Sequence, residues 1–303
     1  MLGFPATRMP SPETRDGNAA SPRVVIGVDF SPPSLSAGRW ALAHVARGAR
    51  AIIAHVLPPT RGDARPNDVE ETTRGLAGYG ATLNVASTQT AAPMGNPSRM
   101  LREVAGESDA SLVIMGRRMD ANRRRIGEGN VVERLTRTAR TSVLVVPEGV
   151  TAAPRVVIAA LDESLFGASV LAAASSVALA CGYSLIVMHV QAPESGAYDR
   201  VIDGGNTTRR RSSQSADASS ALLLSPAWLA ALLRRQQTPD DTRSEVAAGD
   251  PARELVGRAL AVGDALLVVG KRGADATPRG SVGSVARALL ARSPVPVLAV
   301  EVL

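Results

Sequence analysis

Three glycines and a serine near the end of the sequence have the types and the spacing that phosphate binding requires. A short apolar run, residues 266–269, ends in Gly270, and Gly273 follows three residues later. After a further loop, Gly283 and Ser284 open a segment with helical spacing of apolar residues. Glycines let a backbone approach a ligand closely, and the first N–H groups of a helix attract anions. The stretch therefore predicts a strand, a phosphate-binding loop and a helix start, although glycines also serve ordinary strand-to-helix turns.

A carboxylate at the end of another apolar run could complete this site. Asp162 follows such a run, which begins at Val156. In a parallel sheet of strand order 3-2-1-4-5, Asp162 and Gly270 would end neighbouring strands at the point where the order reverses. Open α/β sheets bind ligands at that point. Asp162 could accept hydrogen bonds from a base or a ribose there, but Asp-x-Ser after a strand is also a common helix cap.

The elements that must position these residues are apolar strands that alternate with helices. Apolar runs at residues 24–28, 51–57, 112–116 and 142–146 predict strands in the first half, and an alternating pattern at 82–87 predicts another. Segments with helical periodicity lie between them. This alternation is typical of a doubly wound parallel sheet.

The same pattern occurs a second time in the chain. Residues 155–158 repeat residues 23–26 at an offset of 132. Three further pairs share an offset of 154: Gly116 and Gly270, Gly129 and Gly283, and Val143 and Val297. The sequence is therefore a tandem repeat with extra residues in its second copy.

This repeat predicts two Rossmann-like domains, each a doubly wound five-stranded parallel sheet of strand order 3-2-1-4-5. The first domain is expected at residues 23–150 and the second at 151–303. Residues 1–22 lack periodicity and predict a disordered tail. The extra residues, 195–220, predict a mobile insertion in the second domain, followed by a helix at 222–233.

Composition excludes several classes of protein. The 303 residues are 45% hydrophobic and 20% charged, with a net charge of +6 that is almost entirely arginine, because Lys271 is the only lysine. No aromatic residues are interleaved with the arginines, so we expect no specific nucleic-acid binding. Cys181 is the only cysteine, which excludes an internal disulfide. No apolar run is long enough to cross a membrane, and a cytoplasmic location is the default expectation.

The glycine motif and its surroundings resemble the universal stress protein family. Nucleotide-binding members of that family carry G-x2-G-x9-G-(S/T), and the second copy matches it without a gap. The family's V-D-x-S, H-V, G-D-P-A and P-V-L-V-V motifs are similar to these segments of the second copy: Leu161-Asp162-Glu163-Ser164, His189-Val190, Gly249-Asp250-Pro251-Ala252 and Pro296-Val297-Leu298-Ala299-Val300. The resemblance covers about residues 23–303, apart from the insertion.

The resemblance implies that the second copy binds ATP, with Mg²⁺ possible beside the triphosphate. Asp162 and the backbone at Val190 would lie near the adenine and the ribose. The ribose and phosphates would contact the motif and its neighbour: Gly270, Gly273, Gly283, Ser284 and Val285. Lys271 and Arg272 could screen phosphate charge, although exposed cations after a strand are usually only solvated. The resemblance also implies that the two final strands pair within the chain as a pseudo-dimer, with a homodimer as a further possibility.

The first copy departs from the motif. Gly116 and Gly129 are present, but Met119 stands at the second glycine position and Asn130 at the serine position. A methionine side chain would crowd the place where the backbone approaches phosphate. We therefore predict that the first copy either has lost ATP binding or binds ATP weakly and in a different way.

The function favoured by the sequence is that of an ATP-binding regulatory protein of the stress response, with slow ATP hydrolysis at most. No paired carboxylates and no Ser/His/Asp arrangement suggest a catalytic centre. The glycine-serine and His-x-Gly-His loops of ATP-splitting and adenylating α/β enzymes are absent near the first strand of either copy. The alternative is a nucleotide-independent interaction module that binds protein partners, which the sequence does not identify.

Overall fold

Strands and helices alternate along the described chain. The computed structural model describes residues 21–58, 66–119, 131–191, 227–273 and 282–302. The first repeat contains β1 (Arg23–Gly27), α1 (Pro32–His44), β2 (Arg50–Ala54), α2 (Pro66–Gly80), β3 (Ser87–Ala91), α3 (Pro97–Glu107), β4 (Leu112–Arg117), α4 (Val131–Thr138) and β5 (Ser142–Pro147). The second contains β6 (Val156–Leu161), α5 (Gly167–Cys181), β7 (Ser184–Gln191), α6 (Ala227–Leu233), β8 (Arg243–Ala248), α7 (Pro251–Val262), β9 (Ala265–Gly270), α8 (Ser284–Arg292) and β10 (Val297–Val300).

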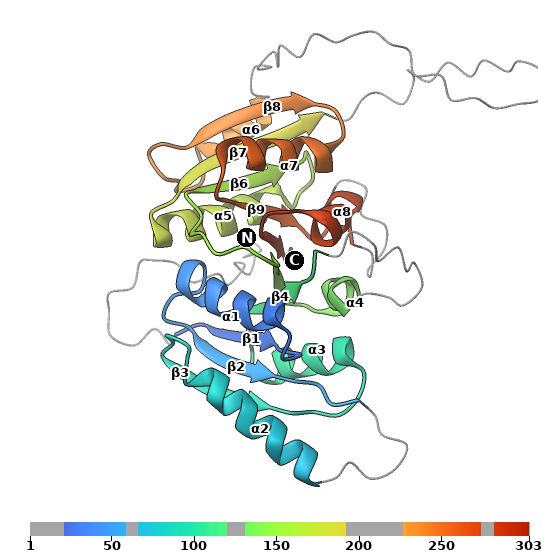
Figure 1. Ribbon diagram of the computed structural model, residues 1–303. Helices are drawn as coiled ribbons and strands as arrows, with labels where there is room; N and C mark the ends of the chain where they lie inside the picture. Colours follow the sequence, from blue (N-terminus) through green and yellow to red (C-terminus); the bar gives the residue numbers. More distant parts are fainter. Residues whose placement is uncertain (1–20, 59–65, 120–130, 192–226, 274–281, 303) are drawn as a thin grey trace, which may run out of the picture.

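The strands form one ten-stranded sheet in the order β3-β2-β1-β4-β5-β10-β9-β6-β7-β8. Within each repeat the strands are parallel and follow the predicted order 3-2-1-4-5. The two five-stranded halves meet where β5 and β10 pair antiparallel, near the middle of the molecule in Figure 1. The predicted fold is thus confirmed, and the predicted pairing of the two final strands is present within the chain.

Helices cover both faces of this sheet (Figure 1). One hydrophobic core lies under α1, α2, α5 and α6, and the other lies under α3, α4, α7 and α8. Side chains alternate between the two faces along a strand. In β5, Leu144 and Val146 enter the first core, whereas Val143 and Val145 enter the second. Each core therefore runs through both repeats.

Equivalent caps begin the third helix of each repeat. Asn96 accepts a hydrogen bond from the backbone of Arg99 at the start of α3, and Asp250 accepts one from Arg253 at the start of α7. A proline occupies the first turn of each helix, a position that needs no N–H donor.

The third strand lies later in the sequence than predicted. The alternating pattern at residues 82–87 belongs mostly to the turn after α2, and the strand is β3, Ser87–Ala91. Leu83 and Val85 mimic a strand because they pack against the core from that turn. β3 is an exposed edge strand of Ser, Thr, Gln and Ala, so it carries no apolar alternation. Residues 1–20 of the predicted tail, the insertion, Gly129 and Asn130 lie outside the described residues.

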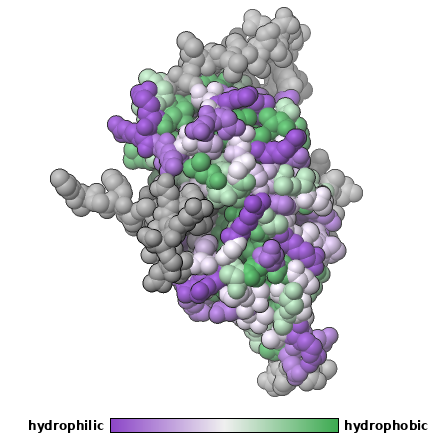
Figure 2. Space-filling model, turned by 90° about the vertical axis from the view of Figure 1, so that its left-hand side faces the viewer, coloured by the Kyte–Doolittle hydropathy of each residue, from purple (hydrophilic) through white to green (hydrophobic). Residues whose placement is uncertain are grey.

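The surface is mixed in character. Figure 2 shows a face on which hydrophilic and hydrophobic residues are interspersed in small patches. Among the helices of the described segments, none has both the length and the apolar character needed to cross a bilayer. The same segments contain no group of three or more His, Cys, Asp or Glu side chains that could bind a metal ion.

We predict that Tyr79 makes the fold sensitive to alkali. Its hydroxyl donates to the Leu35 carbonyl at 2.7 Å, and burial raises the pKa of Tyr79 to about 12 from an ordinary value of 10.0. The unfolded chain loses this proton first, so the free energy of unfolding falls as the pH rises from 10 to 12. The variant Tyr79→Phe should lose less stability over that interval, although it starts about 1 kcal/mol lower because the hydrogen bond is missing. Urea unfolding at pH 8, 10 and 11.5 measures both effects, and an unchanged alkaline loss would contradict the prediction.

Candidate functional site

The candidate site lies at the carboxyl ends of β6 and β9. These strands are parallel neighbours, with Val156 opposite Ala265 and Ala159 opposite Val268. Asp162 follows β6 and Gly270 ends β9, so both lie at the same edge of the sheet. β6 has β7, the next strand in the chain, on one side and β9 on its other side. This is the point where the strand order reverses, as the sequence predicted.

Gly273 lies directly against Asp162. A Cβ atom at Gly273 would be 2.5 Å from Oδ2 of Asp162, a distance that real Cβ contacts do not reach. At Gly270 a Cβ would be 2.7 Å from the carbonyl oxygen of Arg272. Only glycine lets the loop turn this tightly and lets its backbone reach the carboxylate.

The Asp162 carboxylate is held by the turn that follows it. Its Oδ1 accepts hydrogen bonds from the Ser164 backbone at 3.1 Å and from the Ser164 hydroxyl at 2.5 Å. α5 begins later, at Gly167, and Phe166 is its N-cap residue. Asp162 is therefore not the helix cap that the sequence left open as an alternative.

The far end of the glycine loop returns to its beginning. The Gly283 backbone donates to the Lys271 carbonyl at 2.8 Å, which brings the start of α8 beside residues 271–273. Gly283 is the N-cap residue of α8 and supplies no side-chain cap. Ser284 is exposed as the first helical residue, and Val285 is half-buried behind it. The first N–H groups of α8 therefore lie next to the loop, in an arrangement that suits an anion.

Val190 lies on the other side of Asp162, near the end of β7. The preceding residue, His189, is opposite Leu161 in the sheet and donates from Nδ1 to the Leu161 carbonyl at 3.0 Å. The His189 ring also packs edge-on against Trp228, with 5.2 Å between centroids. His189 thus has a packing role, and it fixes the chain just before Asp162.

The two cations of the motif are both held by contacts with other parts of the chain. The Lys271 ammonium is buried and forms an ion pair with Glu301 at 3.0 Å. Burial lowers the pKa of Lys271, and the Glu301 carboxylate opposes this shift. Arg272 also contacts Glu301, at 3.2 Å, and its guanidinium lies 5.3 Å from the ring centre of Phe166. Screening of phosphate by the Lys271 side chain does not fit this geometry.

Glu301 and Phe166 belong to no motif of the sequence. Glu301 immediately follows the last strand, where an isolated acidic residue looks like ordinary surface. A signal was nevertheless present, because the only lysine in the chain follows a buried strand and needs a partner. Phe166 had no comparable signal.

The equivalent crevice in the first repeat is built differently. Gly116 is required by the fold, because a Cβ there would be 2.3 Å from the Pro33 carbonyl oxygen. Met119 occupies the position of Gly273 and is 43% exposed. Phe30 is also exposed, with its ring 5.1 Å from that of His55. This crevice is therefore partly apolar.

Asp29 is the first repeat's counterpart of Asp162. Burial alone would raise the pKa of Asp29, but hydrogen bonds from Ser31 and Ser34 and the charge of Arg118 bring it below its ordinary value. Ser31 contacts Asp29 as Ser164 contacts Asp162. The strand-end turn is thus shared by both repeats, and the difference between them lies in the loop after the fourth strand.

Comparison with known proteins agrees with this architecture. Two Rossmann-like α/β domains in tandem, joined by the antiparallel pair β5 and β10, define the class. The universal stress protein family matches the chain twice, over residues 21–147 and 154–301, so the chain belongs to that family. No curated protein matches the sequence.

Solved structures show the same two-domain arrangement. A universal stress protein from Archaeoglobus fulgidus DSM 4304 is similar with a TM-score of 0.63 and 17% identity, over 93% of this chain and 98% of that one. A functionally unknown protein from Pseudomonas aeruginosa PAO1 is similar with a TM-score of 0.56 and 12% identity, over 93% and 92% of the two chains. At these identities the likeness concerns the fold.

We predict that Gly273→Ala destabilises the protein, because the new Cβ forces Asp162 away from Ser164. Crowding of this kind costs about 1–3 kcal/mol. Gly257→Ala is the matched control, since Gly257 is an exposed position in α7 with open space around it. That variant should gain about 0.5–1 kcal/mol from helix propensity. Urea unfolding compares the two, and equal effects would contradict the tight packing of Gly273.

Proposed function

We propose that the second repeat binds ATP and that the chain acts as an ATP-binding regulatory protein of the stress response. The observation that carries this proposal is the contact between Gly273 and Asp162. A carboxylate and a bare backbone meet there at the switch point of the sheet, where a side chain would fill the space. The proposal includes slow hydrolysis at most, and it places the protein in the cytoplasm.

In this proposal the two ends of the nucleotide contact different elements. The Asp162 carboxylate accepts hydrogen bonds from the ribose or the base, and the backbone at Val190 borders the adenine. The phosphates lie against the backbone at Gly273 and Gly283 and against the first turn of α8, where Ser284 adds its hydroxyl. Mg²⁺ would be carried by the phosphates and would neutralise part of their charge.

The roles of the two cations follow from their contacts. Lys271 contributes only its backbone, because its ammonium is buried against Glu301. Arg272 borders the site while it is held by Glu301 and stacked on Phe166. Phosphate recognition therefore depends on main-chain donors rather than on a charged clamp, which makes the glycine positions decisive.

A second function, interaction with a protein partner, suits the first repeat. Three of its exposed hydrophobic side chains, Phe30, Met94 and Met119, come from the loops after β1, β3 and β4. These loops lie at the carboxyl ends of the first repeat's strands, the position that the glycine site occupies in the second repeat. Because the two half-sheets run antiparallel, the two positions lie at opposite edges of the ten-stranded sheet. An apolar contact there would need no nucleotide.

We predict one ATP site per chain, located in the second repeat. Calorimetry with ATP and Mg²⁺ should give a stoichiometry of one. Gly273→Met copies the first repeat and should weaken binding at least about tenfold, or 1.4 kcal/mol. Ser284→Ala should weaken it less, because it removes one hydroxyl and leaves the loop backbone intact.

Met119→Gly is the control for this experiment, and its affinity should equal that of the wild type. A stoichiometry of two, or full affinity in Gly273→Met, would refute the assignment of the site. An absence of ATP binding in the wild type would favour the interaction module.

A further inference from the structure

Each repeat extends one basic side chain to the end of the other repeat's last helix. Lys271 donates to the carbonyls of Ala139 and Thr141, at 2.9 and 2.6 Å, just beyond α4. Arg117 donates to the Ala291 carbonyl at 3.1 Å and to the Ser293 carbonyl, at the end of α8. Arg117 and Lys271 are equivalent residues, 154 positions apart. The two contacts are therefore reciprocal.

These contacts are favourable because a helix ends in unpaired carbonyl groups that carry partial negative charge. Lys271 is only 3% exposed, and its pairing with Glu301 offsets the cost of burying its charge. Arg117 is partly buried at the same joint. The Glu301 backbone adds a further link, since it donates to the Ser142 hydroxyl at 3.1 Å.

The reciprocal contacts bear on the glycine loop of the second repeat in two ways. The loop begins at Gly270, and the next side chain, Lys271, is anchored in the first repeat. The loop ends at α8, whose far end is held by Arg117. The first repeat thus contacts the residue that follows the first glycine of the loop and the far end of the helix that follows the loop.

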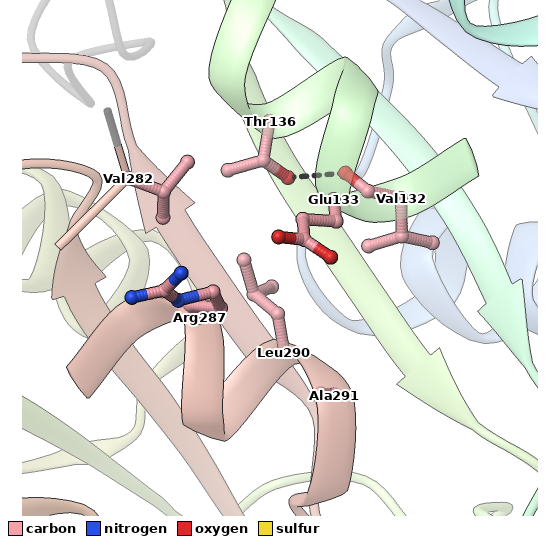
Figure 3. A pocket seen from close by; sticks show the side chains of 7 residues that line it. All are labelled: Val132, Glu133, Thr136, Val282, Arg287, Leu290 and Ala291. Carbon is pink, nitrogen blue, oxygen red and sulfur yellow. Dashed lines mark hydrogen bonds between the residues drawn. The ribbon is translucent and has the colours of Figure 1, made fainter. Parts of the chain in front are cut away.

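A third contact joins the two repeats beside the loop. α4 and α8 line a hollow whose wall includes Glu133 of the first repeat and Arg287 of the second (Figure 3). These residues are also 154 positions apart, and they carry opposite charges. Figure 3 shows both side chains directed into the hollow. The two helices are in contact beside this hollow, and both charged side chains are exposed.

We propose that the first repeat is a positioning domain for the nucleotide site of the second, and that Arg117 is its principal positioning residue. Arg117 sets α8, and α8 presents its first N–H groups to the phosphates. Lys271 ties the start of the loop to the end of α4. This inference rests on the proposed function of the second repeat. It assigns a task to a repeat that lacks the intact motif.

The test compares three variants of the full chain. Arg117→Met removes the charge and both donors, Arg117→Lys keeps the charge, and Arg118→Met removes the charge of the exposed neighbouring arginine. We expect Arg117→Met to weaken ATP binding at least about fivefold, the lower end of typical coupling between sites. Arg117→Lys should recover most of that loss. Arg118→Met should bind ATP like the wild type.

Amide hydrogen exchange without ATP provides an independent measurement. In Arg117→Met, exchange should become faster in the first turns of α8, residues 284–288, while β1 and β2 keep their wild-type rates. Equal acceleration throughout both repeats would show that Arg117 only supports the general fold, and would overturn the proposal. Unchanged exchange in α8 together with unchanged ATP affinity would overturn it as well.

The two proposals fail in different ways. If the wild-type chain binds no ATP, the proposed function is wrong. Hydrogen exchange in α8 then decides alone whether Arg117 positions that helix. If the wild type binds ATP but Arg117→Met binds it equally well, the positioning role is wrong and the nucleotide site stands.

Discussion

The antiparallel pairing of β5 with β10 is the interaction on which the rest of the molecule depends. Val143, Leu144 and Val145 pair with Ala299, Leu298 and Val297, and all six residues are at most 1% exposed. Left alone, each strand would be the bare edge of a sheet with unpaired N–H and C=O groups. Their pairing makes one sheet of the two half-sheets. It also continues each of the two hydrophobic cores from one repeat into the other. The crossed contacts of Arg117 and Lys271 lie beside this pair and depend on it.

With β5 and β10 paired, the two repeats can differ in the loop after their fourth strands while both keep the same fold. Each repeat keeps the packing that the pairing requires, such as Gly116 against Pro33, because a larger residue would disrupt the strand-to-helix contact. Gly273 is different, since its close neighbour is the Asp162 side chain rather than the backbone of a packed helix. The first repeat can therefore carry Met119 at that position while it retains the same fold.

Much of the fold could be predicted from the sequence because its strands are buried on both faces. β4, α4 and β5 lie where the apolar pattern placed them, and the repeat offset of 154 located their counterparts. β3 was misplaced because an edge strand has no buried face to mark it. Of the candidate site, Asp162, Gly270, Gly273 and Gly283 come together as local motifs predict. The direction of Lys271 was not predictable, because it is set by the end of α4, more than a hundred residues earlier in the sequence.

The order of the strands has a consequence for how the chain folds. Among the strands of the described segments, every pairing but one joins residues of the same repeat, whereas Val145 and Val297 are separated by almost the length of a whole domain. Closing so long a segment costs conformational entropy before any contact compensates for it, so local pairings form faster. Each half-sheet can therefore form first, with β5 and β10 as temporary open edges. Until β5 and β10 pair, the folding chain can associate with other chains through these open strand edges. Their pairing removes those edges.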